Sequence, residues 1–158
     1  VVGRLQAVGD GADIRVIVDY AHTPDALERA IRALKETDNA GALWVLFGCG
    51  GDRDPGKRAE MGAIACQFAD RVIVTSDNPR SEAPEAIIDD ILRGCDDSPI
   101  VEADRAAAVA PVIAEAKVGD IVLIAGKGHE DDQEIDGVRL PFNDAEHAVQ
   151  NLQQRQAA

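Results

Sequence analysis

The chain of 158 residues is 46% hydrophobic, so it is long enough to bury one substantial core, and we expect a single domain. Its 16 Lys and Arg stand against 29 Asp and Glu, which gives a formal net charge of −13 at pH 7. We therefore expect no nucleic-acid partner and no membrane-surface partner, because both would need a broad positive field. Any anion that binds must be held locally.

The sequence has no run of roughly 20 apolar residues and no secretion signal at its start, so we expect a cytoplasmic protein. It opens at Val1, without a methionine, directly on strand-like sequence, and we expect that an upstream part is missing. The three cysteines, Cys49, Cys66 and Cys95, are odd in number and lack metal-ligand spacing. They are predicted to be buried or partly buried reduced thiols, and no metal site is predicted.

In chain order, buried β-branched runs alternate with helical patterns. A strand is predicted at 14–18 and a helix at 24–35, then a strand at 43–47 and a helix at 57–68. A strand at 72–75 precedes helices at 84–93 and 104–116, and a strand at 121–125 follows. Thr23 is positioned to cap the first helix, with Pro24 at its first position. Pro111 predicts a kink or a late start in the fourth helix.

The carboxy-terminal part has a different pattern. Short strands at 133–135 and 138–140 flank Asp136-Gly137, a dipeptide typical of a two-residue hairpin turn. A final helix is predicted from Asp144 to about Gln153. Asn143 and Glu146 have the spacing of a capping-box pair at its start.

The alternation predicts an α/β fold: a Rossmann-like, doubly wound, mostly parallel sheet with flanking helices and a carboxy-terminal β-hairpin. Ligands of such sheets bind beyond the carboxyl ends of the strands. Polar or glycine-rich loops follow all four predicted core strands, at 19–22, 48–54, 76–80 and 126–130. Four such loops on one edge of one sheet predict a binding site there.

The glycine-rich loop at 48–51 has two interpretations. Its backbone N–H groups are suited to a phosphate, yet it lacks the last glycine of a dinucleotide fingerprint and the acidic residue expected at the ribose position. A plain tight turn is the alternative. Arg53 is shaped to pair with a carboxylate or a phosphate, or else forms a surface salt bridge with Asp52 or Asp54.

Gly126-Lys127-Gly128 suggests a phosphate loop, but the spacing excludes one. Ile121 stands where that motif needs its first glycine, and Gly128 where it needs Ser or Thr. If the protein uses ATP, most of the triphosphate site therefore lies outside this chain.

Asp77-Asn78-Pro79-Arg80 joins a carboxylate, an amide and a guanidinium around a proline, although Asn-Pro is also an ordinary turn former. Glu130, expected across the same cleft, adds a partner for an ammonium. An arginine and an amide for a carboxylate, with a glutamate for an ammonium, are complementary to the zwitterionic end of an amino acid.

The histidines and the first strand end leave alternatives open. His22 and His129 are either general bases or hydrogen-bonding scaffold, whereas His147 is predicted to be structural or exposed. Asp19 either accepts from ribose hydroxyls or caps the turn that follows it.

Taken together, the loops resemble the Mur ligases, specifically the MurE type that extends UDP-N-acetylmuramoyl-L-alanyl-D-glutamate (UDP-MurNAc-L-Ala-D-Glu). Residues 19–24, 47–54 and 126–130 match the family's motifs, and 77–80 looks like the recognition motif of diaminopimelate-adding members. The resemblance covers residues 1–158 as the family's carboxy-terminal, amino-acid-binding domain. It implies that upstream UDP-sugar-binding and ATP-binding domains are absent.

The resemblance also implies roles for individual residues. Arg80 would bind the distal carboxylate of meso-diaminopimelate. The implied contacts to this substrate are Arg53, Asp77, Asn78, Pro79, Arg80, Gly126 and Glu130, and those to ATP are Arg4, Asp19 and His22. One departure is Asp132, where the family usually has an aromatic residue, which affects local packing.

The implied function is that of an ATP-dependent, ADP-forming ligase of peptidoglycan precursor synthesis. ATP phosphorylates the glutamate γ-carboxylate, and the amine of diaminopimelate then attacks the acyl phosphate. ATP and Mg²⁺ would be bound mainly by the missing central domain, so the isolated domain is expected to be inactive and to hold no catalytic residue. The alternatives are a stand-alone module that binds a small zwitterion, or a ligase that adds another amino acid such as lysine.

Overall fold

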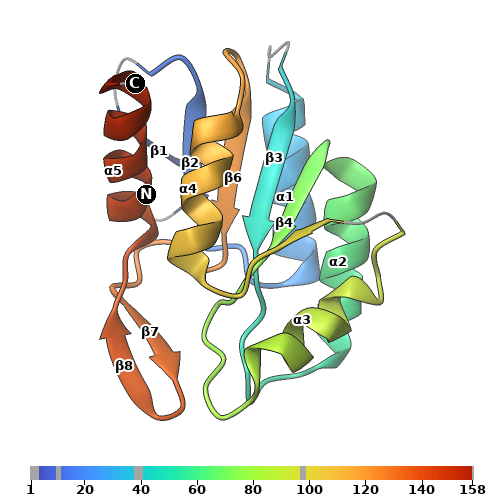
Figure 1. The fold of residues 1–158 in the computed structure, drawn as a ribbon. Helices are drawn as coiled ribbons and strands as arrows, with labels where there is room; N and C mark the ends of the chain where they lie inside the picture. The colour runs from blue at the N-terminus through green and yellow to red at the C-terminus, as the bar shows by residue number, and fades with distance from the viewer. Residues whose placement is uncertain (1–3, 10–11, 38–40, 97–98, 158) are drawn as a thin grey trace.

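The computed structural model describes residues 4–9, 12–37, 41–96 and 99–157. Within them, six strands form one sheet in the order β1-β2-β6-β3-β4-β5, with helices on both of its faces (Figure 1). The core strands β2 (Arg15–Asp19), β6 (Ile121–Ala125), β3 (Leu43–Phe47) and β4 (Arg71–Val74) run parallel. The predicted doubly wound, mostly parallel fold is confirmed.

The sheet has two edge strands that the sequence analysis missed. β1 (Gln6–Val8) pairs antiparallel with β2, and β5 (Ile100–Val101) extends the parallel order beside β4. Strands of three and two residues are too short to show a period-two pattern. The core strands were predicted to within one residue, because their apolar side chains are buried against helices on both sides.

The helices divide between the faces of the sheet. α1 (Pro24–Lys35), α2 (Gly56–Phe68) and α3 (Pro84–Leu92) pack on one face, and α4 (Arg105–Glu115) and α5 (Asp144–Ala157) on the other. Each face has its own apolar core. Successive strand residues alternate between them, as Val45 and Leu46 do. Among the described residues, the structure has no helix with the length and apolarity to cross a membrane.

Most helix boundaries agree with the predictions. The Thr23 hydroxyl accepts from the Ala26 N–H at 3.2 Å, and Asn143 Oδ1 accepts from the Glu146 N–H at 3.0 Å, so both predicted caps form. Of the two expectations for Pro111, a kink or a late start, the late start is wrong, because Asp104 caps α4 and the helix continues through Pro111. α5 runs to Ala157, beyond the predicted end.

The predicted hairpin forms a separate two-stranded sheet from β7 (Asp132–Ile135) and β8 (Val138–Pro141). Asp136 and Gly137 have φ values of 49° and 77°, as a turn with two left-handed residues requires. The hairpin projects below the carboxyl edge of the main sheet (Figure 1). Asp132 pairs with Arg139 across the two strands at 3.3 Å, so a polar contact stands where relatives were expected to have an aromatic residue.

A buried ion pair ties α4 and α5 to the sheet. Nε and Nη2 of Arg105 each donate to one carboxylate oxygen of Asp144 at 2.8 Å, and both side chains are fully buried. The same guanidinium donates to the carbonyls of Ser76 at 2.9 Å and Ala125 at 3.0 Å. These carbonyls lie just beyond β4 and at the end of β6, so Arg105 fixes the two strand ends relative to each other.

The replacement Arg105→Met should lower the free energy of unfolding by about 3–5 kcal/mol, because it leaves the Asp144 carboxylate buried without a counter-charge. Urea denaturation of the variant measures this loss. Arg32→Met removes an exposed arginine that pairs with Glu28 one turn away, and should cost about 0.5 kcal/mol or less. A loss for Arg105→Met as small as that of the control would contradict the role of the buried pair.

Candidate functional site

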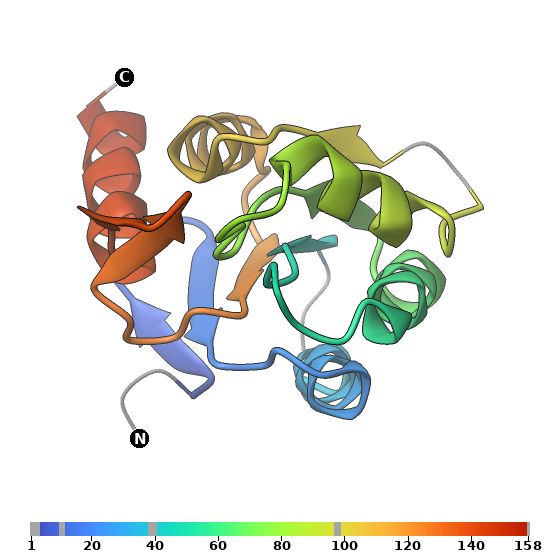
Figure 2. The same cartoon turned by 90° about the horizontal axis from the view of Figure 1, so that it is seen from below.

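A cavity of about 450 Å³ opens at the carboxyl edge of the sheet, where the sequence predicts a site. Seen from below in Figure 2, the hairpin and the loops before α2 and α3 gather around this edge. The residues that line the cavity come from all four predicted loops and from α2. They are Tyr20, His22, Gly48, Cys49, Gly50, Arg53, Asp54, Lys57, Arg58, Met61, Asp77, Asn78, Arg80, Gly126 and Glu130.

The floor of the cavity is acidic. Asp77 and Glu130 both line it, and the fully buried ammonium of Lys127 lies 3.9 Å from Asp77 Oδ1 and 3.1 Å from Glu130 Oε1. Burial raises the pKa of Asp77, while the positive charges of Arg105 and Lys127 act to lower it. Counting Asp77, Glu130 and Lys127 as −1, −1 and +1, this group has a net charge of −1. The floor is therefore suited to a cation.

The Asn78 side chain has a fixed orientation. Its Oδ1 accepts from Lys127 Nζ at 3.0 Å and from the backbone N–H of Glu134 at 2.9 Å. An ammonium and a backbone N–H can only donate, so the atom that they contact must be the amide oxygen. The Nδ2 group remains to donate, and a carboxylate of a ligand is a suitable acceptor for it.

Arg80 lies at the rim of the cavity in a constrained position. Its Nη1 donates to the Gly51 carbonyl at 2.9 Å, and its Nε lies 3.5 Å from Glu134 Oε1. Its backbone has a φ of 53° and is held on both sides, since its N–H donates to Glu134 O at 3.0 Å and its carbonyl accepts from Asp136 at 2.7 Å. A left-handed conformation is costly for a residue other than glycine, and the hairpin holds Arg80 in it.

Two further arginines differ in their surroundings. Arg58 is buried and donates to Glu82 at 2.7 Å, to Asp90 at 3.0 Å and to the Gly50 carbonyl at 3.1 Å, so it supports the rim. Arg53 is exposed, and its Nη1 donates to the backbone carbonyl of Asp52. Among the described residues Arg53 bonds to the Asp52 backbone and to no carboxylate, so the predicted alternative of a salt bridge with Asp52 or Asp54 is not observed.

The glycine-rich loop is tightly packed against the loop that carries Asn78 and Pro79. A Cβ atom on Gly51 would lie 1.8 Å from the Pro79 carbonyl oxygen, and one on Gly48 would lie 2.4 Å from the Thr75 carbonyl oxygen. The Gly51 N–H donates to the Asn78 carbonyl at 2.7 Å. The close approach of the two backbone segments is therefore a sufficient reason for glycine at positions 48 and 51.

A second cavity of about 450 Å³ lies beside the first. It is lined by Arg4, Leu5, Asp19, Tyr20, Ala21, His22, Ala26, Arg29, Ala30 and Ala33. Asp19 accepts from the Leu5 N–H at 2.7 Å with one oxygen and from the Ala21 N–H at 2.8 Å with the other. Asp19 thus caps the following turn, as one of its two interpretations predicted, and each oxygen keeps a free lone pair.

Tyr20 and His22 line both cavities. The Tyr20 hydroxyl donates to Glu130 Oε2 at 2.9 Å, and this bond raises the pKa of Tyr20. The rings of His22 and His129 each lie 5.5 Å from the Tyr20 ring, and His22 Nδ1 lies 2.8 Å from the Tyr20 carbonyl. Both histidines thus contact the wall between the cavities. His147 packs on Phe142 at 4.4 Å, which agrees with its predicted structural role.

The residues singled out from the sequence fall into two groups in space. All of those assigned to the amino acid line the first cavity except Pro79. The Pro79 carbonyl packs on Gly51. All of those assigned to ATP, namely Arg4, Asp19 and His22, line the second. Sequence reasoning missed Tyr20, Lys127 and Arg58. In the sequence, the lysine between two glycines suggests only a phosphate loop. In the structure, the carboxylates of Asp77 and Glu130 lie close to this lysine and account for its burial.

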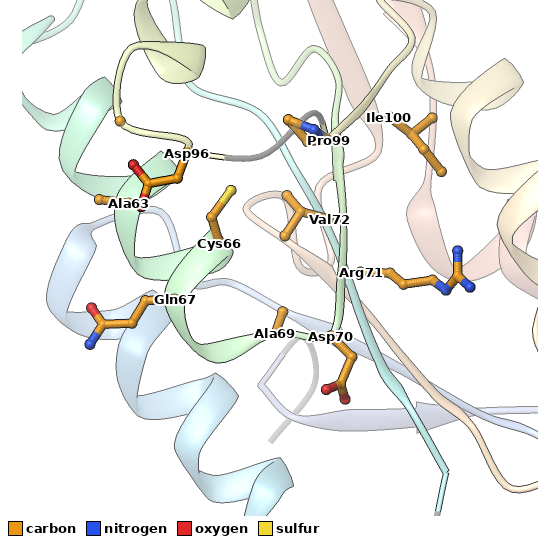
Figure 3. Close-up of a pocket in the computed structure, with 11 residues that line it drawn as sticks. Ala63, Cys66, Gln67, Ala69, Asp70, Arg71, Val72, Asp96, Pro99 and Ile100 are labelled. Carbon is orange, nitrogen blue, oxygen red and sulfur yellow. The ribbon is translucent and has the colours of Figure 1, made fainter.

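A third hollow, of about 530 Å³, lies at the opposite edge of the sheet, near the start of β4 and the end of α2 (Figure 3). Cys66 lies in its lining, and none of the predicted site residues does. Cys49 and Cys95 are buried and partly buried free thiols, and burial raises the pKa of each to about 12. The prediction of buried or partly buried reduced thiols is confirmed.

Comparison with known proteins identifies the family. The model of the "Mur ligase, glutamate ligase domain" family matches residues 3–128. The chain belongs to the Mur ligase family. It is 57% identical over 152 residues to a protein of Chromobacterium violaceum and 56% identical over 153 residues to one of Pseudomonas aeruginosa. Both are named UDP-N-acetylmuramoyl-L-alanyl-D-glutamate–2,6-diaminopimelate ligase, and they align with 95% and 96% of this chain.

A solved structure of a ligase with the same name superposes on this Mur ligase domain with a TM-score of 0.91 at 46% identity, covering 98% of this chain and 32% of that one. The chain spans 31% of the length of both sequence relatives, about a third of such a ligase. Within the residues that the structure describes, no three His, Cys, Asp or Glu side chains are arranged to hold a metal ion.

The replacement Gly51→Ala should lower the free energy of unfolding by about 1–3 kcal/mol, because its methyl group has no space beside the Pro79 carbonyl and one of the two loops must move. Thermal or urea unfolding measures this loss. Gly56→Ala is the matched control, because the nearest atom to its new methyl group is a side-chain oxygen of Asp54 at 3.1 Å. Equal stabilities of the two variants would show that the loops are not locked together.

Proposed function

We propose that this chain is the carboxy-terminal, amino-acid-binding domain of an ATP-dependent ligase that adds meso-diaminopimelate to UDP-MurNAc-L-Ala-D-Glu in peptidoglycan precursor synthesis. The observation that carries the proposal is one cavity with an acidic floor and an arginine rim, in a domain of the family of the diaminopimelate ligases. UDP-sugar-binding and ATP-binding domains would make up the remaining length of the protein, and the complete ligase would act in the cytoplasm.

The charges of the cavity are complementary to an amino acid. Asp77 and Glu130 supply the negative charge for an ammonium, and the fixed Asn78 amide supplies a donor for the carboxylate. Arg53 and Arg80 add guanidinium groups at the rim, where a bidentate pair with a carboxylate is strong and directional. An ammonium and a carboxylate thus each meet groups of opposite charge within one cavity.

The rim favours diaminopimelate over lysine. Lysine ends in an ammonium alone, whereas meso-diaminopimelate has a second α-amino acid group with its own carboxylate. We propose that Arg80 binds this distal carboxylate. Its guanidinium is held by Gly51 and Glu134 and needs little reorganisation before binding, so little conformational entropy is lost.

The residues of the second cavity are suited to the phosphates and ribose of a nucleotide. Arg4 offers a positive charge for phosphates, the free lone pairs of Asp19 offer acceptors for ribose hydroxyls, and Ala26, Ala30 and Ala33 give an apolar surface. His22 lies between this cavity and the first. These residues suit part of an ATP molecule, and we propose that the central domain binds most of its triphosphate together with Mg²⁺.

In this scheme the chain presents an amine. ATP, when bound, supplies a phosphoryl group that activates the D-glutamate carboxylate as an acyl phosphate. The residues of the first cavity hold diaminopimelate so that one amino group remains free to attack. The developing charge on the phosphate needs positive groups, which an acidic floor cannot supply, so the isolated domain should not catalyse.

In the full-length ligase, Arg80→Ala should raise the KM for meso-diaminopimelate about 30-fold, in line with about 2 kcal/mol for a charged hydrogen-bonded pair. Turnover with lysine in its place should change much less, because lysine has no distal carboxylate to lose. Steady-state release of phosphate with each amino acid measures the ratio.

The control for this experiment is Arg93→Ala, which removes an exposed arginine that pairs with Asp90. It should leave both kinetic constants near those of the unchanged ligase. Equal losses for the two amino acids in Arg80→Ala would remove Arg80 as the specificity residue. If the unchanged full-length protein has the same kcat/KM for lysine as for diaminopimelate, or a higher one, the lysine-adding alternative is supported instead.

The replacement Arg4→Ala should raise the KM for ATP about tenfold or more, because a hydrogen bond to a charged group contributes about 1.5–3 kcal/mol. The KM for meso-diaminopimelate should stay the same, because Arg4 lines only the second cavity. Arg15→Ala, at the other end of β2, serves as the control. A parallel rise in both KM values would mean that Arg4 acts on the fold of this edge and not on the nucleotide.

A further inference from the structure

The side chain of Lys127 is a buried cation whose polar partners all belong to the first cavity. It is fully buried, it donates to Asn78 Oδ1 at 3.0 Å and to Glu130 Oε1 at 3.1 Å, and it lies 3.9 Å from Asp77 Oδ1. A buried ammonium is costly unless it is paired and fully hydrogen-bonded. Asn78 and Glu130 accept hydrogen bonds from two of its three donor hydrogens, and the Asp77 carboxylate adds an ion pair.

The backbone around Lys127 is shaped to direct the side chain inward. The flanking Gly126 and Gly128 have φ values of 116° and 55°, in the region that L-residues other than glycine rarely adopt. A Cβ atom on Gly126 would lie 2.6 Å from Asp77 Oδ2. The Gly-Lys-Gly sequence therefore brings the backbone against the Asp77 carboxylate and places the lysine between the two carboxylates beneath the cavity.

We propose that Lys127 is a positioning residue that sets the charge of the amine-binding floor and orients the groups that receive the ligand. Without it, the negative charge of Glu130 would raise the pKa of Asp77 with no Lys127 ammonium to oppose it. With it, two acidic groups surround one cation, and the formal net charge of −1 matches one ammonium. This inference rests on the proposed binding of an amino acid.

Lys127 also orients two groups that the ligand would meet. Its bond to Asn78 directs the amide oxygen away from the ligand and leaves the amide nitrogen to donate to it. Its bond to Glu130 holds one carboxylate oxygen, while the Tyr20 hydroxyl holds the other. Further charged or titratable groups act on this floor from the surrounding elements, namely Arg105, Asp144 and Cys49.

The first test is the pH dependence of kcat/KM for meso-diaminopimelate in the full-length ligase carrying Lys127→Gln. The KM should rise at least about tenfold. The acid limb of the profile should move to higher pH, because a carboxylate that has lost its neighbouring cation binds protons more tightly. A residue needed only for packing would lower activity at all pH values and leave the limb in place.

The second test measures stability without any substrate. Lys127→Gln leaves the floor at −2, Glu130→Gln leaves it neutral, and the double variant returns it to −1. Urea unfolding of the four proteins forms a double-mutant cycle. The double variant should unfold at a higher urea concentration than Lys127→Gln alone, because removing Glu130 removes the repulsion that the first change created.

The controls separate this inference from the proposed function. Lys35→Gln, at the exposed end of α1, should change neither the acid limb nor the unfolding midpoint. If the unchanged ligase does not use diaminopimelate, the proposed function fails, and the unfolding cycle still tests the charge balance. An unshifted acid limb together with additive effects in the cycle would overturn the role of Lys127.

Discussion

The cavity depends on a guanidinium buried beneath it. Arg105 joins the carbonyls of Ser76 and Ala125, which precede the Asp77 loop and the Gly126 loop, and it is neutralised by Asp144 from α5. A parallel sheet brings strand ends to one edge but does not by itself fix the loops beyond them. Arg105 does so with hydrogen bonds to both strand ends. The helices on that face thereby contribute to the site without lining it.

A second buried cation, Lys127, lies next to the residues that line the cavity. Arg105 is fully neutralised by its own carboxylate and serves the framework, whereas Lys127 is shared between two carboxylates of the cavity and leaves an excess of negative charge. The difference lies in the number of acidic partners, since both side chains are fully buried. A cation without access to water thus stabilises the fold in one place and sets the formal charge of the cavity floor in the other.

The sequence predicted the parts of this molecule that depend on local pattern. Strong β-branched runs gave the core strands, the cap at Thr23 gave a helix start, and Asp136-Gly137 gave the hairpin. The short edge strands were missed, because their positions depend on pairing with β2 and β4. Of the site, the residue types at the strand ends were predictable, since any parallel sheet gathers them.

The connections between the loops were not predictable. The bond between Lys127 and Asn78 spans 49 positions, and that between Tyr20 and Glu130 spans 110. Neither leaves a periodic signal in one sequence. The left-handed backbone of Arg80 likewise depends on hydrogen bonds from the hairpin, a separate element.

In the proposed function the two cavities need opposite charges, and this difference accounts for their separation. An amine site needs excess negative charge to hold an ammonium, whereas phosphoryl chemistry needs excess positive charge around the transferred group. One cavity with the floor of Asp77 and Glu130 cannot meet both demands. Here the acidic floor lies on one side of Tyr20, and Arg4 and Arg29 line the cavity on the other. In the proposed function, the chain, with a net charge of −13, is better suited to hold the amine, and a separate domain would supply most of the positive charge around ATP.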